Sequence, residues 1–433
     1  MLLFSILIYT ACEDHVHFPK VKQYPADVAV AWINLQQKLT LKTPGYGPGV
    51  TGRAFAYVGL SLYESVVPGM PGYRSMVNVL GGPSITPPAD CNHFYWPASA
   101  NAAMADMIRN LFVTTSAANK VTIDSLESAF NTQFAPYGDA QILQASAAFG
   151  KTVAATLFEW SKTDGGHEGY LPQPPLYTPN PLPGKWVPTP PALAPAAFPT
   201  AGNNRTFVAG LTAMTQPAYT LPAYSPDPGS GFYNMVNEVY TISLSLTPTD
   251  INTVKRWGDI PGNYNGTAHF TNIATQLIVS KNLKLDEAAL VYAKHGIALN
   301  DAIISVFKTK YVYELVRPIT YIRNIMMYAT WNTVIPTPPH PEFSSAHSVI
   351  GKASSVVLEG FFGKKCAFTD HTMEALYGAR SYPNLAAYAV EGGWSRVLAG
   401  IHYKPSVDIG LSQGKKVGDL VNNLPFKIGS QHD

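Results

Sequence analysis

The sequence predicts an all-α fold of ten or more helices joined by long loops rich in proline and glycine. Hydrophobic residues make up 46% of the 433 residues, enough for a large buried core, and they recur at helical spacing through most of the chain. Patterns typical of strands are few. The 36 prolines and 34 glycines interrupt the periodic segments. We expect residues 13–433 to form a single all-α domain.

The predicted helices share an apolar stripe that returns every three or four residues. Between Asp27 and Leu41, for example, Val28, Trp32 and Leu35 fall on one face. In chain order, the helices are expected at 27–41, 53–67, 101–113, 121–133, 140–162, 231–244, 270–280, 286–312, 345–362, 385–399 and 406–422.

The segment 172–199 interrupts this pattern. It contains eleven prolines in 28 residues and therefore cannot be a helix. Such a segment could link two domains. Because it also carries large apolar side chains such as Trp186 and Phe198, we favour an ordered loop packed on the surface.

Charge and cysteine content exclude several classes of function. The 30 Lys and Arg nearly balance the 28 Asp and Glu, so nucleic acid is not expected as a partner. The three cysteines form no CxxC pair, which excludes a cysteine zinc site and a disulfide framework. Cys91 and Cys366 either pair with each other or remain separate thiols, and the sequence leaves both open.

Residues 1–12 resemble a secretion signal. The run is apolar but too short to span a bilayer, and Thr10-Ala11-Cys12 is similar to the end of a bacterial lipoprotein signal. We expect an exported protein, periplasmic or on the outer surface, whose membrane contact is a lipid anchor at Cys12. The alternative is a cytosolic protein with an apolar N-terminus. No later segment has 18 consecutive apolar residues.

Polar groups suited to binding an oxyanion gather in the last third of the chain, about residues 300–422. The first cluster holds Lys310 and Arg317. Seven residues are nearly two helical turns, so we expect both cations on one helix face, with Pro318 placing Arg317 at the helix end. Taken alone, this cluster would be explained better by a solvated basic face.

The second cluster precedes a predicted helix. Ser344 or Ser345 is a natural N-cap, and the small Ala346 would let an anion approach the main-chain amides. His347 follows directly. A hydroxyl, several N–H groups and an imidazole would therefore meet at the positive end of a helix dipole.

The third cluster holds Arg396 and His402. Gly400 offers a helix stop between them, so His402 can turn back towards Arg396. Pro405 would open the next helix. Together the three clusters supply three cations, a hydroxyl, main-chain amides and two histidines, a set that matches a phosphate or vanadate group.

The order K-x6-R-P, S-S-A-H and S-R-x5-H resembles the signature shared by vanadium-dependent haloperoxidases and type 2 phosphatidic acid phosphatases. Weaker resemblance to bacterial haloperoxidase-like proteins covers earlier segments, including Asp164–Tyr170 and Asn300-Asp301-Ala302.

The resemblance implies a helical bundle that binds vanadate. His402 would be the ligand to vanadium, and Lys310 would also polarise bound hydrogen peroxide. His347 would be the acid–base group. The equatorial oxygens would contact Lys310, Arg317, Arg396, Ser345 and the Ala346 amide. The substrates would be hydrogen peroxide, a halide ion and a small organic acceptor.

Several positions depart from the family pattern. Ser344 and Ala346 replace the usual Pro and Gly. The related phosphatases carry Asp four residues after the last histidine, where this chain has Ser406, with Asp408 as the nearest acid. His340 occupies a position where bromide-oxidising enzymes carry a histidine, and Phe307 stands where Trp is common. Both residues are candidates for the halide pocket.

Three functions follow from these observations. The first is vanadate-dependent oxidation of bromide or iodide by hydrogen peroxide. The second is an exported acid phosphatase in which His402 forms a phosphohistidine and His347 protonates the leaving alcohol. The third is a surface lipoprotein that binds an anion or a partner without catalysis.

Two residues outside the clusters bear on the site. His269 is expected to be a hydrogen-bonded structural histidine. Asp259, after Trp257-Gly258, is first expected to be structural, and the second interpretation is that it orients a cation of the site.

Overall fold

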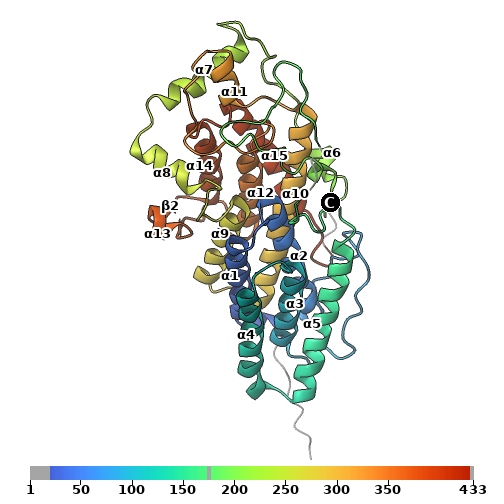
Figure 1. Cartoon of the computed structure of the whole chain (residues 1–433). Coiled ribbons are helices and arrows are strands. Elements are labelled where there is room, and N and C mark those ends of the chain that lie inside the picture. Colours follow the sequence, from blue (N-terminus) through green and yellow to red (C-terminus); the bar gives the residue numbers. More distant parts are fainter. Residues whose placement is uncertain (1–19, 173–176, 430–433) are drawn as a thin grey trace, which may run out of the picture.

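The computed structural model describes residues 20–172 and 177–429, so the leader predicted at residues 1–12 lies outside the described residues. The all-α prediction is confirmed (Figure 1). The larger helices are α1 (Asp27–Lys42), α2 (Pro48–Val66), α3 (Trp96–Leu111), α4 (Ala117–Phe134), α5 (Ala140–Ser161), α7 (Gly231–Ser243), α8 (Pro248–Arg256), α9 (Gly266–Ser280), α10 (Leu285–Tyr313), α12 (Ala346–Phe362), α14 (Leu385–Leu398) and α15 (Lys404–Asn422). Shorter helices are α6 (Leu211–Thr215), α11 (Pro318–Asn324) and α13 (Glu374–Tyr377).

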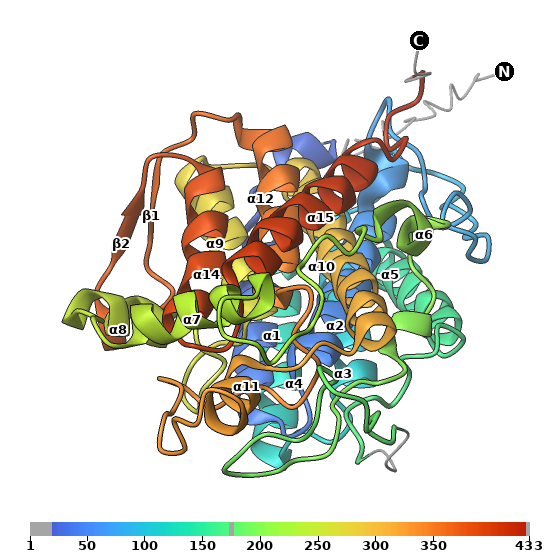
Figure 2. The same cartoon turned by 90° about the horizontal axis from the view of Figure 1, so that it is seen from above.

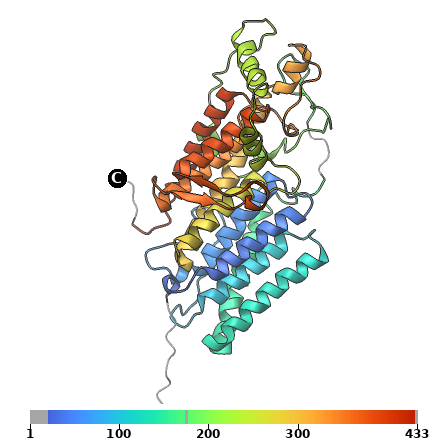
Figure 3. The same ribbon diagram turned by 90° about the vertical axis from the view of Figure 1, so that its left-hand side faces the viewer.

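The helices form two halves that lie end to end along the long axis of the molecule (Figure 3). Helices α1 to α5 form one half, and α2 is buried along nearly its whole length. Helix α10 packs against α2 at a close approach, because a Cβ on Gly59 would lie 2.5 Å from the Tyr292 carbonyl oxygen. This contact joins the two halves.

The other half is built around α12. Helices α9, α10, α14 and α15 all pack against α12 or against each other, as Figure 2 shows from above. The apolar face of α12 contributes Val349, Ala353, Val357 and Leu358 to the core. Its N-terminus points towards the segments that carry the site.

A two-stranded antiparallel sheet follows α12 in the chain and precedes α14, and it packs beside α9 and α14. Strand β1 (Phe368–Asp370) pairs with β2 (Arg380–Tyr382) in the register Phe368 to Tyr382. These strands were not predicted, because segments of three residues carry too little periodicity to be recognised.

The proline-rich loop is ordered and packed over its described residues, as predicted. Trp186 is fully buried, and its main-chain N–H donates to the Glu314 carbonyl at 2.6 Å. Further along, the Ala197 N–H donates to the Pro339 carbonyl at 2.7 Å. The loop therefore holds the segment that leads into α12.

Other predictions need correction at the level of single elements. Helix α2 begins at Pro48 instead of residue 53, because Pro48 occupies the first helical turn. The helix α8 and the shorter helices α6, α11 and α13 were not predicted. Cys91 and Cys366 are both free thiols. None of the helices in the described ranges is long and apolar enough to cross a membrane.

Candidate oxyanion site

Lys310 and Arg317 come together at the loop 338–342 that precedes α12. The Lys310 ammonium donates to the carbonyls of Pro341 and Glu342, each at 2.9 Å. The Arg317 guanidinium donates to the carbonyls of His340 at 2.9 Å and Ile401 at 2.8 Å. Both side chains are fully buried. Burial lowers the pKa of Lys310 well below its usual value, with Arg317 adding to the effect, and lowers that of Arg317 to about 10.

The expectation that Lys310 and Arg317 lie on one helix face is wrong. Helix α10 ends at Tyr313, and Glu314 takes a left-handed conformation with φ 53°. Arg317 is therefore the N-cap of α11 and does not share a helix face with Lys310. The two cations meet because the chain turns at Glu314 and both side chains bind the loop 338–342.

The start of α12 provides an unusual N-terminus. Ser345 is the N-cap, as predicted, but its hydroxyl makes no capping bond and has no hydrogen-bond partner although the residue is fully buried. Ser344 instead donates to the Gln413 side chain at 2.7 Å. The Ser345 hydroxyl and the first amides of the helix are thus available to an acceptor.

His402 lies in the turn between α14 and α15, as predicted. Gly400 has φ +77°, and the amides of Ile401 and His402 return to the Arg396 carbonyl at 3.2 and 3.3 Å. Pro405 lies in the first turn of α15. The turn places the His402 Nε2 atom 3.2 Å from the Arg317 guanidinium.

Glu342 fixes the tautomer of His402. The His402 Nδ1 atom lies 2.7 Å from the Glu342 carboxylate, which also accepts the Tyr403 N–H at 3.0 Å. A carboxylate at Nδ1 keeps the proton there, so Nε2 faces Arg317 with its lone pair. Burial raises the pKa of Glu342 to about 7, and the charges of Arg317 and Lys310 oppose that rise.

Glu342 was missed by the sequence analysis, although it lies inside the second motif. An acid partner for the last histidine was sought only downstream, at Ser406 and Asp408. Asp408 instead pairs with Lys404 at 2.7 Å on the exposed side of α15. The signal that could have found Glu342 was a carboxylate within a cluster of cations.

Arg396 and His347 converge on the segment after α8. The Arg396 guanidinium donates to the Trp257 carbonyl at 2.9 Å. The His347 Nε2 atom lies 3.6 Å from the Asp259 carboxylate. Asp259 in turn accepts the Gly266 N–H at 2.9 Å. Burial, followed by the charge of Arg396, lowers the pKa of His347. Asp259 therefore lies beside the predicted site, as in the interpretation that it orients a cation there, but the side chain that it pairs with is the histidine His347.

His340 contacts Arg317, and Phe307 packs against His340. The His340 Nδ1 atom is 2.9 Å from the Arg317 guanidinium. The two rings of His340 and Phe307 meet edge to face, 5.3 Å apart. Phe198 of the proline-rich loop packs against Phe307 at 5.5 Å. These rings form an aromatic wall beside the cations.

The donor set fits a tetrahedral oxyanion such as vanadate. Arg396 Nε, Ser345 Oγ and His347 Nε2 are buried polar atoms without hydrogen-bond partners. Buried donors are normally satisfied, so their convergence near three buried cations calls for an acceptor with several oxygens. Within the described residues, no group of three or more His, Cys, Asp and Glu side chains is arranged to hold a metal ion.

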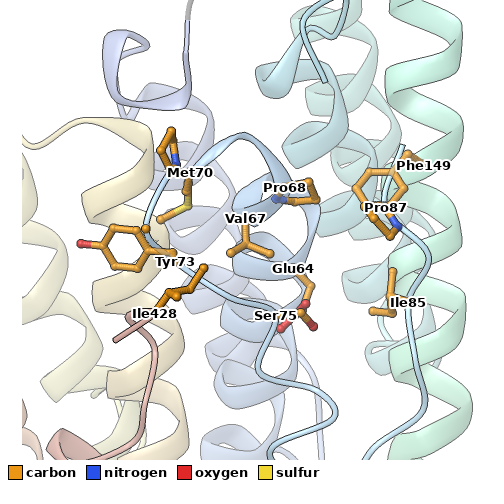
Figure 4. Close-up of a pocket in the computed structure, with 12 residues that line it drawn as sticks. Glu64, Val67, Pro68, Met70, Tyr73, Ser75, Ile85, Pro87, Phe149 and Ile428 are labelled. Carbon is orange, nitrogen blue, oxygen red and sulfur yellow. The ribbon is translucent and has the colours of Figure 1, made fainter. Parts of the chain in front are cut away.

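A separate hollow of about 350 Å³ lies at the other end of α2 (Figure 4). Its lining includes Glu64, Tyr73, Phe149 and Ile428, and none of the predicted site residues. The N-terminal end of α2 approaches Phe198 instead, since a Cβ on Gly47 would lie 3.3 Å from that ring. A helix of 19 residues spans about 28 Å, so the hollow and the oxyanion cluster are distinct.

The chain is similar to proteins of known family and structure. Residues 325–428 match the sequence model of the VCPO second helical-bundle domain. A bacterial vanadium-dependent iodoperoxidase of known structure is 28% identical, with a TM-score of 0.84 over 94% of this chain and 98% of that chain.

More distant structures share the fold. A holo-type bacterial vanadium-dependent chloroperoxidase is 17% identical, with a TM-score of 0.67 over 87% of this chain and 92% of that chain. An apo-type structure of such an enzyme is 16% identical, with a TM-score of 0.63 over 93% and 94% of the two chains. No curated protein sequence matches the chain. The predicted resemblance to the vanadium-dependent haloperoxidases is confirmed.

Proposed function

We propose that this protein is a vanadium-dependent haloperoxidase that oxidises bromide or iodide with hydrogen peroxide. The observation that carries the proposal is the set of buried donors without partners, Arg396 Nε, Ser345 Oγ and His347 Nε2, on the motif segments that also supply His402. The likeness to an iodoperoxidase over nearly the whole of both chains supports the same reaction class.

The residues of the cluster divide into a ligand and an oxygen-binding shell. His402 Nε2 would bind the metal, because Glu342 holds the proton on Nδ1. Lys310, Arg317 and Arg396 would neutralise the oxygens, and Ser345 Oγ with the Ala346 N–H would donate to them. Vanadate, when bound, supplies a Lewis acid that activates peroxide without a change in its oxidation state.

His347 would hold and move a proton. Its Nε2 atom has no hydrogen-bond partner, and Asp259 lies 3.6 Å away. The residue retains 9% of its surface exposed, so the proton can exchange with solvent. Because burial lowers the pKa of His347, the neutral ring is available near neutral pH to take a proton from incoming peroxide.

We expect halide to approach beside His340 and Phe307. The aromatic wall excludes water on one side, and Arg317 presents positive charge beside it. A polarisable anion such as bromide or iodide suits such a surface, because it is desolvated more easily than chloride. We therefore expect oxidation of iodide and bromide, and little oxidation of chloride.

Halide oxidation before and after addition of orthovanadate tests the proposal. Protein purified without vanadium is expected to be inactive, to gain bromide or iodide oxidation on addition of orthovanadate, and to lose it in His402→Ala. The matched control is His371→Ala, which removes an exposed histidine paired with Glu374 at 2.9 Å. Absence of activity at saturating orthovanadate would contradict the proposal.

A second candidate is the acid phosphatase, and the Glu342–His402 contact favours it. The missing acid after the last histidine argued against a phosphohistidine mechanism, but Glu342 supplies an orienting carboxylate from another element. His402 Nε2 could then attack phosphorus while His347 protonates the leaving alcohol. Hydrolysis of phosphomonoesters that orthovanadate abolishes, without halide oxidation, would make this candidate primary.

Failure of both assays would leave the third function, a non-catalytic anion-binding protein. Export with a lipid anchor at Cys12 is a further part of the proposal. Mass spectrometry of the mature N-terminus tests it. A lipidated cysteine is expected, and an intact residue Met1 would contradict export by this route.

A further inference from the structure

The buried pair of His269 and Asp370 lies outside the residues assigned to the site. The His269 Nε2 atom is 2.8 Å from the Asp370 carboxylate, and both side chains are almost completely buried. Asp370 also accepts the Thr372 N–H at 2.8 Å and the Gln276 amide at 3.4 Å. Burial opposes ionisation of Asp370, but His269 and these donors outweigh it, so the pKa of the carboxyl lies below its usual value.

The His269 ring is a platform for Trp257. The two rings stack with centroids 4.4 Å apart and an interplanar angle of 14°. The Trp257 indole N–H donates to Glu391 of α14 at 3.1 Å. On its remaining side, a Cβ on Gly392 would lie 3.5 Å from the indole. The indole is therefore fixed from α9 on one face and from α14 on its edge.

The main chain of the fixed segment reaches the site directly. The Trp257 carbonyl accepts from Arg396 at 2.9 Å. Two residues later, Asp259 faces His347. One short segment thus orients one cation and the proton-transfer histidine.

We propose that the His269–Asp370 pair is a positioning device for Arg396 and His347, acting through the stacked Trp257. Asp370 fixes the plane of the imidazole, the imidazole fixes the indole, and the indole fixes the carbonyl that holds Arg396. The small sheet takes part in this positioning, because β1 ends at Asp370 and places its carboxylate beside His269 of α9. It rests on the proposed function only in the choice of orthovanadate as probe.

Asp370→Asn tests the proposal, because it keeps the size of the side chain and removes its charge. Titration calorimetry of the full chain with orthovanadate is expected to show affinity roughly tenfold weaker, the usual loss when an outer-shell partner is removed. The KM for halide at saturating orthovanadate should remain unchanged. His371→Gln is the matched control, since it removes an exposed His–Glu pair from the adjacent residues, and its affinity should equal that of the wild type.

The crystal structure of the same variant gives a second readout that needs no vanadate. Loss of the Arg396–Trp257 hydrogen bond would support the proposal, and its retention together with unchanged orthovanadate affinity would overturn it. If the wild type binds no orthovanadate, the proposed function fails and the crystal structure alone decides the inference. Should Asp370→Asn not fold, the double variant His269→Gln/Asp370→Asn replaces it, because it leaves no unpaired buried partner.

Discussion

His402 illustrates how a single side chain acquires its chemistry from its neighbours. Nδ1 lies against Glu342, and Nε2 lies against Arg317. Burial, followed by the charges of Arg317 and Lys310, lowers the pKa of His402 well below its usual value. The imidazole is therefore neutral, with its lone pair on the atom that faces the cluster.

The first prediction concerns Glu342. Replacement by Gln keeps the shape and removes the charge that holds the proton on Nδ1. We expect orthovanadate affinity to fall roughly 10- to 100-fold, as for other carboxylate–histidine–metal arrangements. Titration calorimetry measures this change. Glu374→Gln, at the exposed His371 pair, is the control, and equal affinities in the two variants would contradict the role of Glu342.

At this scale the motif residues were predictable, and their supporting contacts were not. Lys310, Arg317, Arg396 and His402 follow from motif spacing in the sequence. Glu342 and Trp257 act on them through contacts 60 and 139 residues apart in the chain. Sequence marks Glu342 at most as a carboxylate within a cluster of cations, and it does not pair either residue with its partner, so the contacts themselves come only from the folded structure.

At the scale of single elements, the turn between α14 and α15 carries a second prediction. Gly400 has φ +77°, and a Cβ there would lie 2.8 Å from the Trp331 ring. Gly400→Ala should cost about 1–2 kcal/mol of stability through backbone strain, and more through the clash. It should also weaken orthovanadate binding, because it moves His402.

Gly363→Ala is the matched control for this turn. Gly363 has φ +82° directly after α12, and apart from its own chain neighbours no atom of the described residues lies within 4 Å of an added Cβ. It should lose stability through strain alone and keep its orthovanadate affinity. Thermal unfolding and calorimetry separate the two effects. Equal orthovanadate affinities in both variants would contradict a role of the Gly400 turn in placing His402.

A third prediction concerns Glu64 on α2, at the edge of the hollow. Its carboxylate accepts the Met76 N–H at 2.7 Å, and burial raises its pKa from 4.5 to about 7. The folded state therefore binds this proton more tightly than the unfolded state. The resulting stabilisation is complete below pH 4.5 and is lost as the pH rises through 7, by at most roughly 3 kcal/mol.

Glu64→Gln removes this contribution and retains an acceptor for the Met76 N–H. The stability of the variant relative to the wild type should rise between pH 5 and pH 8, as measured by denaturant unfolding at each pH. If the difference in unfolding free energy between variant and wild type stays constant over that range, the pKa of Glu64 does not differ between the folded and unfolded states.

The long helices were predictable from periodicity, whereas the short elements depended on tertiary contacts. Helices such as α5 and α10 carry an apolar pattern over 22 and 29 residues. Helix α13 and the strands β1 and β2 have only three or four residues each. They are held by partners such as His269 for Asp370, which propensity does not encode.

At the scale of the whole molecule, the site lies where distant parts of the chain meet. Residues that line the site or hold its segments come from five parts of the chain: the proline-rich loop, the segment after α8, and the ends of α10, α12 and α14. The all-α class and the packing of this loop were predictable from composition. The division into two halves was not, because it depends on close approaches such as that at Gly59.

The fourth prediction follows from this convergence. Orthovanadate binds groups from several elements at once, so it should stabilise the fold as a whole. At 100 times the dissociation constant, the gain is about 2.7 kcal/mol. The melting temperature should rise with orthovanadate in the wild type and remain constant in His402→Ala. A rise of equal size in both proteins would place the binding elsewhere.

The most direct test of the central claim is a crystal structure of the full chain grown with orthovanadate. We expect anomalous density for vanadium within bonding distance of His402 Nε2, with its oxygens contacting Lys310, Arg317, Arg396 and Ser345. Density at another place, or none at a concentration that supports halide oxidation, would contradict the assignment of these residues as the oxyanion site.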